Sequence, residues 1–208
     1  MTHSALLLST GFHNSERQQA AALFWEAFGA KLGKIMAPAQ KATAFFAQTL
    51  DPDYCICARS PQGTLLGLAG FKTSDGAFSG GGLAQMARHY GWLQTLLRAP
   101  VLAALERKLT PDELLMDGIF VTKEARGRGV GSALLTAIKQ AAVTHGYKQL
   151  RLDVIDTNPR ARALYERQGF VAGEAHSAWP LRRMLGFSYA TTMIWTPPES
   201  ADTIGLAG

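Results

Sequence analysis

A basic, glycine-rich segment joins a predicted strand to a predicted helix in the second half of the chain. Residues 126–131 read Arg-Gly-Arg-Gly-Val-Gly, and the apolar run before them, residues 114–121, predicts a buried strand. Apolar residues at helical spacing then predict a helix over residues 130–145. A helix that begins in glycines exposes backbone N–H groups, and its dipole favours negative charge there. The segment therefore predicts a site for a phosphate or pyrophosphate group.

Two common phosphate loops fit this segment poorly. A P-loop requires a Lys after its last glycine, and no Lys follows Gly131. A dinucleotide fingerprint, counted from Gly129, requires a third glycine where Leu134 stands, and it turns directly from strand to helix. Here residues 122–125 intervene, although Asp153 lies roughly 20 residues downstream, as a ribose-binding acid would. An NAD(P)-binding protein is therefore the weaker alternative.

A second motif occupies residues 158–170. Asn158 is a good N-cap, Pro159 suits the first helical position, and Gly169 suits a left-handed C-cap before a new strand. Because seven residues make about two helical turns, Asn158, Ala161 and Tyr165 are expected to share one helix face. Taken alone, this helix is better explained by a capping Asn and a half-buried Tyr than by a binding site.

Together the two motifs resemble the GCN5-related N-acetyltransferase (GNAT) family. Arg126, Gly129 and Gly131 match its R-x-x-G-x-G loop, and residues 158–170 are similar to its second signature. The resemblance covers residues 114–172 and implies an α/β (α+β) fold. That fold is a mixed, mostly antiparallel sheet flanked by helices, with the two motif strands splayed apart and the pantetheine arm of acetyl-CoA between them.

The resemblance also implies a set of site residues. Tyr165 is the expected general acid, and Asp117 is the candidate base, with water or an ordinary structural carboxylate as the alternatives. Asn158 is expected to hold the pantetheine arm, and backbone N–H groups of the strand are expected to polarise the thioester carbonyl. The expected cofactor contacts are Ile119, Phe120, Val121, Arg126, Gly127, Arg128, Gly129, Val130, Gly131, Ser132, Asn158 and Arg160.

The chain is expected to catalyse direct acetyl transfer from acetyl-CoA to a primary amine of unknown identity. A non-catalytic CoA-binding sensor is the alternative from another class. The net charge of +5 is spread along the chain, which disfavours nucleic acid as a partner, and no apolar run is long enough to span a membrane. The histidines and the pair Cys55 and Cys57 show no metal-ligand spacing, so no metal and a reduced, cytoplasmic protein are expected.

The chain reads as one domain over residues 1–198, followed by a loose tail at 199–208. Apolar runs at 54–59 and 64–71 flank a turn at 60–63 and predict a β-hairpin. A helical insertion at 79–110 separates this hairpin from the first motif strand, and Pro100 is expected to break its two helices. Three roles are open for the insertion: a cover packed on the sheet, a wall of the acceptor pocket, or a contact in a homodimer.

Overall fold

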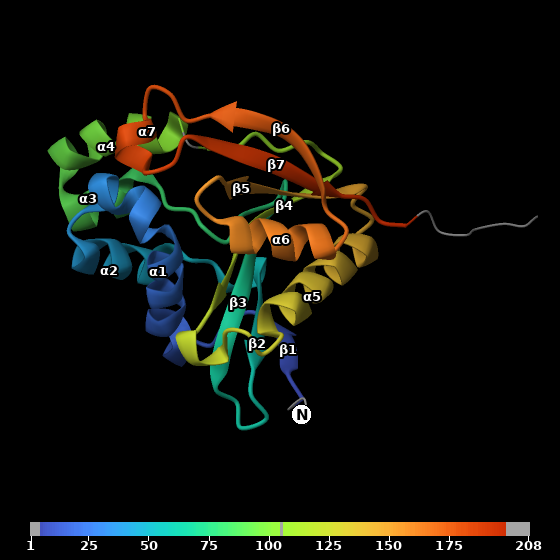
Figure 1. Ribbon diagram of the computed structural model, residues 1–208. Coiled ribbons are helices and arrows are strands. Elements are labelled where there is room, and N and C mark those ends of the chain that lie inside the picture. The colour runs from blue at the N-terminus through green and yellow to red at the C-terminus, as the bar shows by residue number, and fades with distance from the viewer. Residues whose placement is uncertain (1–4, 105, 199–208) are drawn as a thin grey trace, which may run out of the picture.

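Seven strands form one mixed sheet in the computed structural model, which describes residues 5–104 and 106–198. Their order is β1-β2-β3-β4-β5-β7-β6, and every neighbouring pair is antiparallel except β4 and β5 (Figure 1). This sheet confirms the predicted fold class, while the tail predicted at 199–208 lies outside the described residues. The strands are β1 (Leu7–Thr10), β2 (Cys55–Arg59), β3 (Leu65–Lys72), β4 (Glu113–Val121), β5 (Gln149–Ile155), β6 (Val171–Ser177) and β7 (Tyr189–Trp195).

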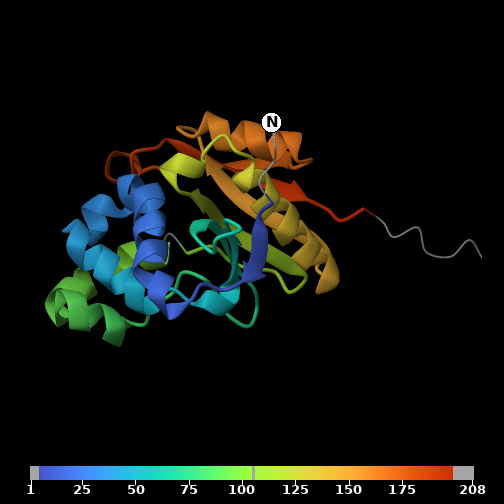
Figure 2. The same ribbon diagram turned by 90° about the horizontal axis from the view of Figure 1, so that it is seen from below.

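Helices cover both faces of the sheet (Figure 2). Along β2, Cys55 and Cys57 face one apolar cluster while Ile56 and Ala58 face the other, because successive strand residues point to opposite faces. All of β2 is therefore buried. The first cluster lies under α1 (Arg17–Met36) and α2 (Ala39–Thr49), and the second lies under α5 (Val130–Thr144) and α6 (Pro159–Arg167). The remaining described helices are α3 (Leu83–Tyr90), α4 (Trp92–Ala104) and α7 (Arg182–Leu185), with 3₁₀ turns at Asn14–Glu16, Pro52–Tyr54 and Lys123–Ala125.

The strands β4 and β5 separate soon after they begin. Their parallel pairing is confined to Glu113 with Gln149, Leu114 with Leu150, and Leu115 with Arg151. Both strands continue beyond this pairing, β4 to Val121 and β5 to Ile155. The predicted splay between the two motif strands is thereby confirmed.

A bulge interrupts β4 beside this splay. Gly70 of β3 pairs with Gly118, whereas the next residue, Phe71, pairs with Met116, so Asp117 has no partner residue on β3. A bulge of this kind kinks a strand and re-aims the side chain of the extra residue. The irregularity therefore turns Asp117 away from the regular alternation of the strand.

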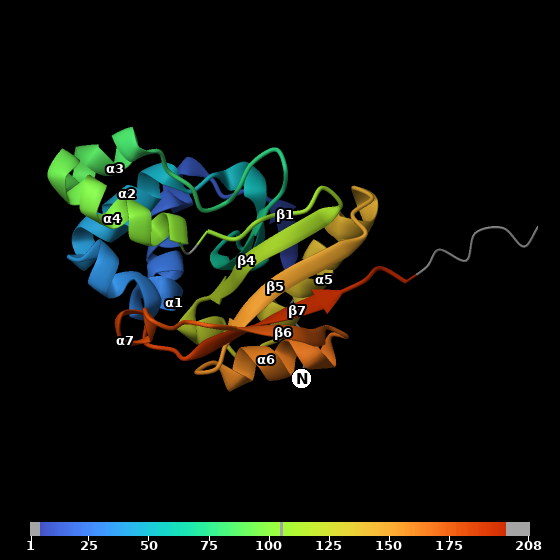
Figure 3. The same ribbon diagram turned by 90° about the horizontal axis from the view of Figure 1, so that it is seen from above.

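The insertion differs from its predicted form. Its two helices are divided at Gly91, whose φ of 78° ends α3, whereas Pro100 lies inside α4. The helix continues past Pro100 because Val101 and Leu102 pack against the core, which offsets the hydrogen bond that proline cannot make. Both helices lie beside α1 and α2 rather than along the sheet (Figure 3). Of the three roles left open for the insertion, this position disfavours a cover packed on the sheet. The outer face of α4 exposes Trp92, Leu93, Leu96 and Leu97.

Two other helices differ from the sequence predictions. An apolar stripe at helical spacing predicts a first helix over residues 16–28. The helix α1 instead runs to Met36, through Gly29 and Gly33. The side chains of Ile35 and Met36 are buried in the core under α1, and this packing stabilises the additional helical turns. The short helix α7 was not predicted, since four residues are too few to show helical periodicity.

Two glycine-to-alanine variants are expected to shift the free energy of unfolding in opposite directions. A Cβ at Gly67 would lie 2.6 Å from the backbone oxygen of Phe120, so Gly67→Ala forces β3 from β4 and costs about 2 kcal/mol. A Cβ at Gly33 meets nothing within 4 Å, so Gly33→Ala gains roughly 0.5–1 kcal/mol from helix propensity. Urea denaturation followed by circular dichroism measures both values, and equal shifts would contradict the close packing of β3 on β4.

Candidate active site

The space between the splayed strands forms a cleft of about 600 Å³. Residues 117–120 of β4 line one side, and residues of β5 and α6 line the other. Asn158, Ala161 and Tyr165 all contribute to this lining, which confirms that they share one face of α6. The cleft thus brings the strand that leads into the glycine-rich segment beside the second motif.

The glycine-rich segment forms the N-terminus of α5. Gly129 is its N-cap with a φ of 83°, and Gly127 has a φ of 74°, so both adopt the left-handed conformation that favours glycine. The first helical hydrogen bond runs from the Ala133 N–H to the Gly129 carbonyl at 3.0 Å. The N–H groups of the preceding turn, those of Val130, Gly131 and Ser132, therefore have no intrahelical acceptor. They form an array of donors at the positive end of the helix dipole.

The basic side chains beside this array differ in how they are held. Arg126 donates from Nη2 to Glu26 at 2.7 Å and from Nε to the Val121 carbonyl at 3.2 Å, which fixes its guanidinium at the end of β4. Arg128 and Arg160 are exposed, the latter on the first turn of α6. All three cations therefore lie where the two motif helices begin.

The amides of β4 divide into two sets. The Thr122 N–H donates to the Leu66 carbonyl of β3 at 2.9 Å. Because successive N–H groups of a strand point to opposite sides, the Phe120 N–H also faces β3, whereas those of Ile119 and Val121 face β5. Since β5 has separated from β4 at this level, these two N–H groups border the splay. The expected contribution of the Phe120 amide is therefore not supported by its direction.

The two polar side chains of α6 are placed by different forces. Asn158 caps the helix, its Oδ1 accepting from the Ala161 N–H at 3.2 Å, as the sequence predicts. This cap uses only the oxygen of the side-chain amide. The ring of Tyr165 is buried against Phe170, and burial raises the pKa of the Tyr165 hydroxyl to about 12. The phenol therefore keeps its proton at neutral pH.

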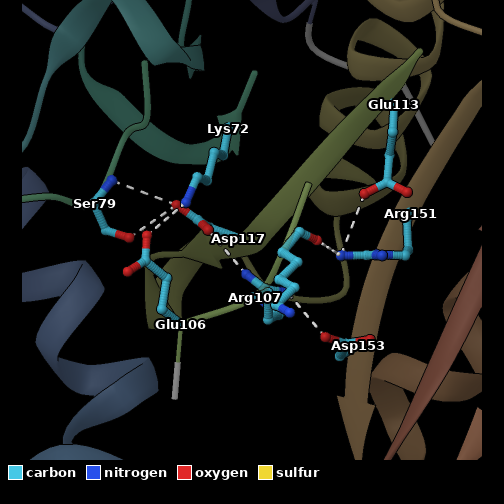
Figure 4. A network of polar contacts seen from close by, with 9 residues as sticks. Lys72, Ser79, Glu106, Arg107, Glu113, Asp117, Arg151 and Asp153 are labelled. Carbon is cyan, nitrogen blue, oxygen red and sulfur yellow. Dashed lines mark hydrogen bonds and ion pairs between the residues drawn. The ribbon is translucent and has the colours of Figure 1, made fainter. Parts of the chain in front are cut away.

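Asp117 lies between the two ends of the insertion (Figure 4). Its carboxylate accepts from Ser79 Oγ at 2.9 Å and from Arg107 Nη2 at 2.9 Å. Arg107 also pairs through Nη1 with Asp153 of β5 at 3.3 Å, and Thr192 donates to the same Asp153 at 2.7 Å. A single guanidinium thus bridges carboxylates on both splayed strands.

Sequence reasoning did not find Arg107 or Ser79, and it considered Asp153 only as a ribose-binding acid. Neither Arg107 nor Ser79 belongs to one of the two motifs. Their one sequence signal is that they lie near the two ends of the predicted insertion at 79–110. It also missed Lys31, which lines the cleft with its Nζ 5.5 Å from the Phe187 ring centroid. Burial, with a smaller effect of the neighbouring Arg107, lowers the pKa of Lys31.

Within residues 5–104 and 106–198, no cluster of three or more potential metal-ligating side chains is found. None of the helices in that part of the chain is both long and apolar enough to cross a membrane.

Curated relatives match parts of this chain. The thialysine N-epsilon-acetyltransferase of Bos taurus is 39% identical over 56 residues, which are 27% of this chain and 33% of that protein. The 5-NmdU N-acetyltransferase of Pseudomonas phage PaMx11 is 32% identical over 104 residues, or 50% of this chain and 67% of that protein. The chain thus matches about a third of the bovine protein and a larger share of the phage protein.

Solved structures share the whole fold at low sequence identity. A GCN5-related N-acetyltransferase from Kribbella flavida is 17% identical with a TM-score of 0.62, covering 93% of this chain and 98% of its own. The ribosomal-protein-S18-alanine N-acetyltransferase from Escherichia coli is also 17% identical, with a TM-score of 0.57 over 97% and 99% of the two chains. The acetyltransferase (GNAT) family matches residues 17–170, a range that contains both motifs. This chain therefore belongs to the acetyltransferase (GNAT) family.

Proposed function

We propose that this protein is an acetyl-CoA-dependent N-acetyltransferase that acts on a primary amine by direct transfer in a ternary complex. One observation carries the proposal: Gly131 of the α5 N–H array lies next to Ile119, and Ile119 lines the cleft that also contains the protonated phenol of Tyr165. The array can donate hydrogen bonds to a pyrophosphate, and the cleft can hold a narrow chain such as the pantetheine arm. Acetyl-CoA combines those two parts with a thioester, which supplies the acetyl group.

The chain offers a contact for each part of this donor. The N–H groups of Val130, Gly131 and Ser132, with Gly127 and Gly129 shaping the turn, would bind the pyrophosphate. Arg126, Arg128 and Arg160 would add positive charge. Asn158 would bind the amides of the pantetheine arm through its side-chain N–H₂ group.

Acetyl transfer requires the amine to lose a proton. An amine with a pKa near ~10.4 is almost fully protonated at neutral pH, and exposing its lone pair costs about 4–5 kcal/mol. Asp117 would accept that proton, and the N–H groups of Ile119 and Val121 would donate to the carbonyl oxygen as negative charge develops on it. Tyr165 would then donate its proton to the departing thiolate and regain one from the second N–H of the transferred amine. The proton taken by Asp117 would pass to solvent, so the proton balance closes.

Direct transfer predicts that acetyl-CoA alone leaves no acetyl group on a cysteine. Cys55 and Cys57 are buried in β2, with their sulfur atoms 4.0 Å apart, and neither lines the cleft. Intact-protein mass spectrometry with acetyl-CoA and no amine is expected to show unmodified cysteines. A stoichiometric adduct on Cys55 or Cys57 that an added amine discharges would contradict direct transfer.

The two free thiols also support our placement of the protein in the reducing cytoplasm.

The proposed activity is tested by following the release of free thiol from acetyl-CoA in the presence of primary amines. We expect release to depend on both the amine and the enzyme. A non-catalytic CoA-binding domain, the alternative function, would bind acetyl-CoA without releasing thiol, so binding and turnover measured together separate the two.

A further inference from the structure

A second cavity of about 550 Å³ lies beside the cleft, between α1, α2 and the insertion. The two spaces share three lining residues: Glu106, Arg107 and Asp117. Asp117 therefore has the cleft on one side and the second cavity on the other. A molecule in this cavity would reach the proposed base from the side opposite the donor.

The cavity is lined mainly by apolar side chains. Phe24, Met36 and Leu115 are nearly fully buried members of its wall, and α3 and α4 contribute Met86 and Leu102. Burying apolar ligand surface against such a wall contributes about 25 cal/mol per Å². The body of the ligand is therefore expected to be apolar, and the insertion forms one wall of its site.

The charges in the cavity are already matched. Lys72 pairs with Glu106 at 2.9 Å, and Arg107 pairs with Asp117 at 2.9 Å. Of the described residues that line the cavity, these are the two cations, and each has a carboxylate partner. A carboxylate or a second ammonium on the ligand would lose hydration without gaining a free counter-charge. The cavity thus disfavours amino acids and polyamines.

We propose that this cavity is the acceptor site, and that the acceptor is a primary amine on an uncharged apolar body, such as an arylalkylamine or a branched alkylamine. This inference rests on the proposed function for its chemistry. The amine nitrogen lies at the Asp117 end of the cavity, and the apolar body extends between α2 and the insertion.

The site is tested first by binding without acetyl-CoA. Ligand-observed NMR with 2-phenylethylamine is expected to show binding about tenfold tighter than that of phenylalanine or 1,5-diaminopentane. Ala99→Trp fills the cavity and is expected to remove this binding. Leu97→Trp, on the exposed side of the same helix, is the matched control and is expected to retain it. Absence of 2-phenylethylamine binding to the folded wild type, or equal binding of phenylalanine or 1,5-diaminopentane, would overturn the inference.

Turnover then separates this inference from the proposed function. With acetyl-CoA present, kcat/KM for 2-phenylethylamine is expected to exceed that for phenylalanine or 1,5-diaminopentane, each of which carries a second charge, by about tenfold or more. If amines that carry a second charge, or peptide N-termini, are acetylated with a kcat/KM equal to that of 2-phenylethylamine, the acceptor inference fails while the acetyltransferase proposal stands. If 2-phenylethylamine binds in the cavity but acetyl-CoA is neither bound nor consumed, the proposed function fails and the site stands. The amine series on the wild type keeps the inference falsifiable even if Ala99→Trp does not fold.

Discussion

Replacing Tyr165 with Phe is expected to lower kcat about 100-fold or more while leaving the affinity for acetyl-CoA unchanged. The change removes one hydroxyl from the wall of the cleft and keeps the buried ring against Phe170. A thiolate that leaves without a proton is the poorer leaving group, so the loss appears in turnover rather than in binding. Steady-state kinetics with calorimetry on the same preparations measures both quantities.

The matched control is Tyr189→Phe, which removes a hydroxyl from an exposed residue outside the cleft and is expected to have no effect. Burial raises the pKa of Tyr165 to about 12, so its acid form persists as the pH rises through 10. The wild type is therefore expected to show no alkaline loss of kcat from this group below pH ~11. Unchanged kcat in Tyr165→Phe would remove the phenol from the mechanism.

Asp117→Asn is expected to lower kcat/KM at neutral pH by about 100-fold. The substitution preserves the shape of the side chain and its place on the β4 bulge, but the neutral amide cannot accept the proton of an ammonium ion. Raising the pH towards the pKa of the amine is expected to restore much of the activity, because the free amine then forms without a base.

Asp153→Asn is the control for Asp117→Asn because it removes the other carboxylate partner of the same guanidinium, Arg107. If Asp117 is the base, Asp153→Asn shows a much smaller loss and no alkaline recovery. Equal losses and equal pH profiles in the two variants would show that Asp117 acts only by positioning Arg107. Water would then be the better candidate for the base.

The features predicted correctly from sequence depend on local signals. The turn at Gly129 requires a left-handed residue, the helix at Asn158 requires a cap and an early proline, and the shared face of α6 follows from helical geometry. Apolar runs at 54–59, 64–71 and 114–121 placed β2, β3 and β4 within a residue of their bounds. The splay followed from the family resemblance rather than from any property of the strands themselves.

The features missed depend on contacts between residues far apart in the chain. Asp117 meets Ser79 and Arg107 only because the insertion folds back so that both of its ends reach the β4 bulge. Neither residue has neighbours of a recognisable pattern, and a bulge leaves no periodicity in an apolar strand. The position of the helix break at Gly91 was missed for a related reason, since tertiary packing overrides the local cost of Pro100.

The most direct test of the central claim is a calorimetric titration of acetyl-CoA into the wild type, Ser132→Asp and Ser132→Asn. Ser132 lies in the first turn of α5, where a carboxylate stabilises the helix by roughly 0.3–1 kcal/mol but repels a phosphate bound at the same N–H array. We expect Ser132→Asp to be at least as stable as the wild type yet to bind acetyl-CoA about tenfold more weakly or worse, with the neutral Ser132→Asn close to the wild type. No binding by the folded wild type, or equal binding by Ser132→Asp, would contradict a donor site at the N-terminus of α5.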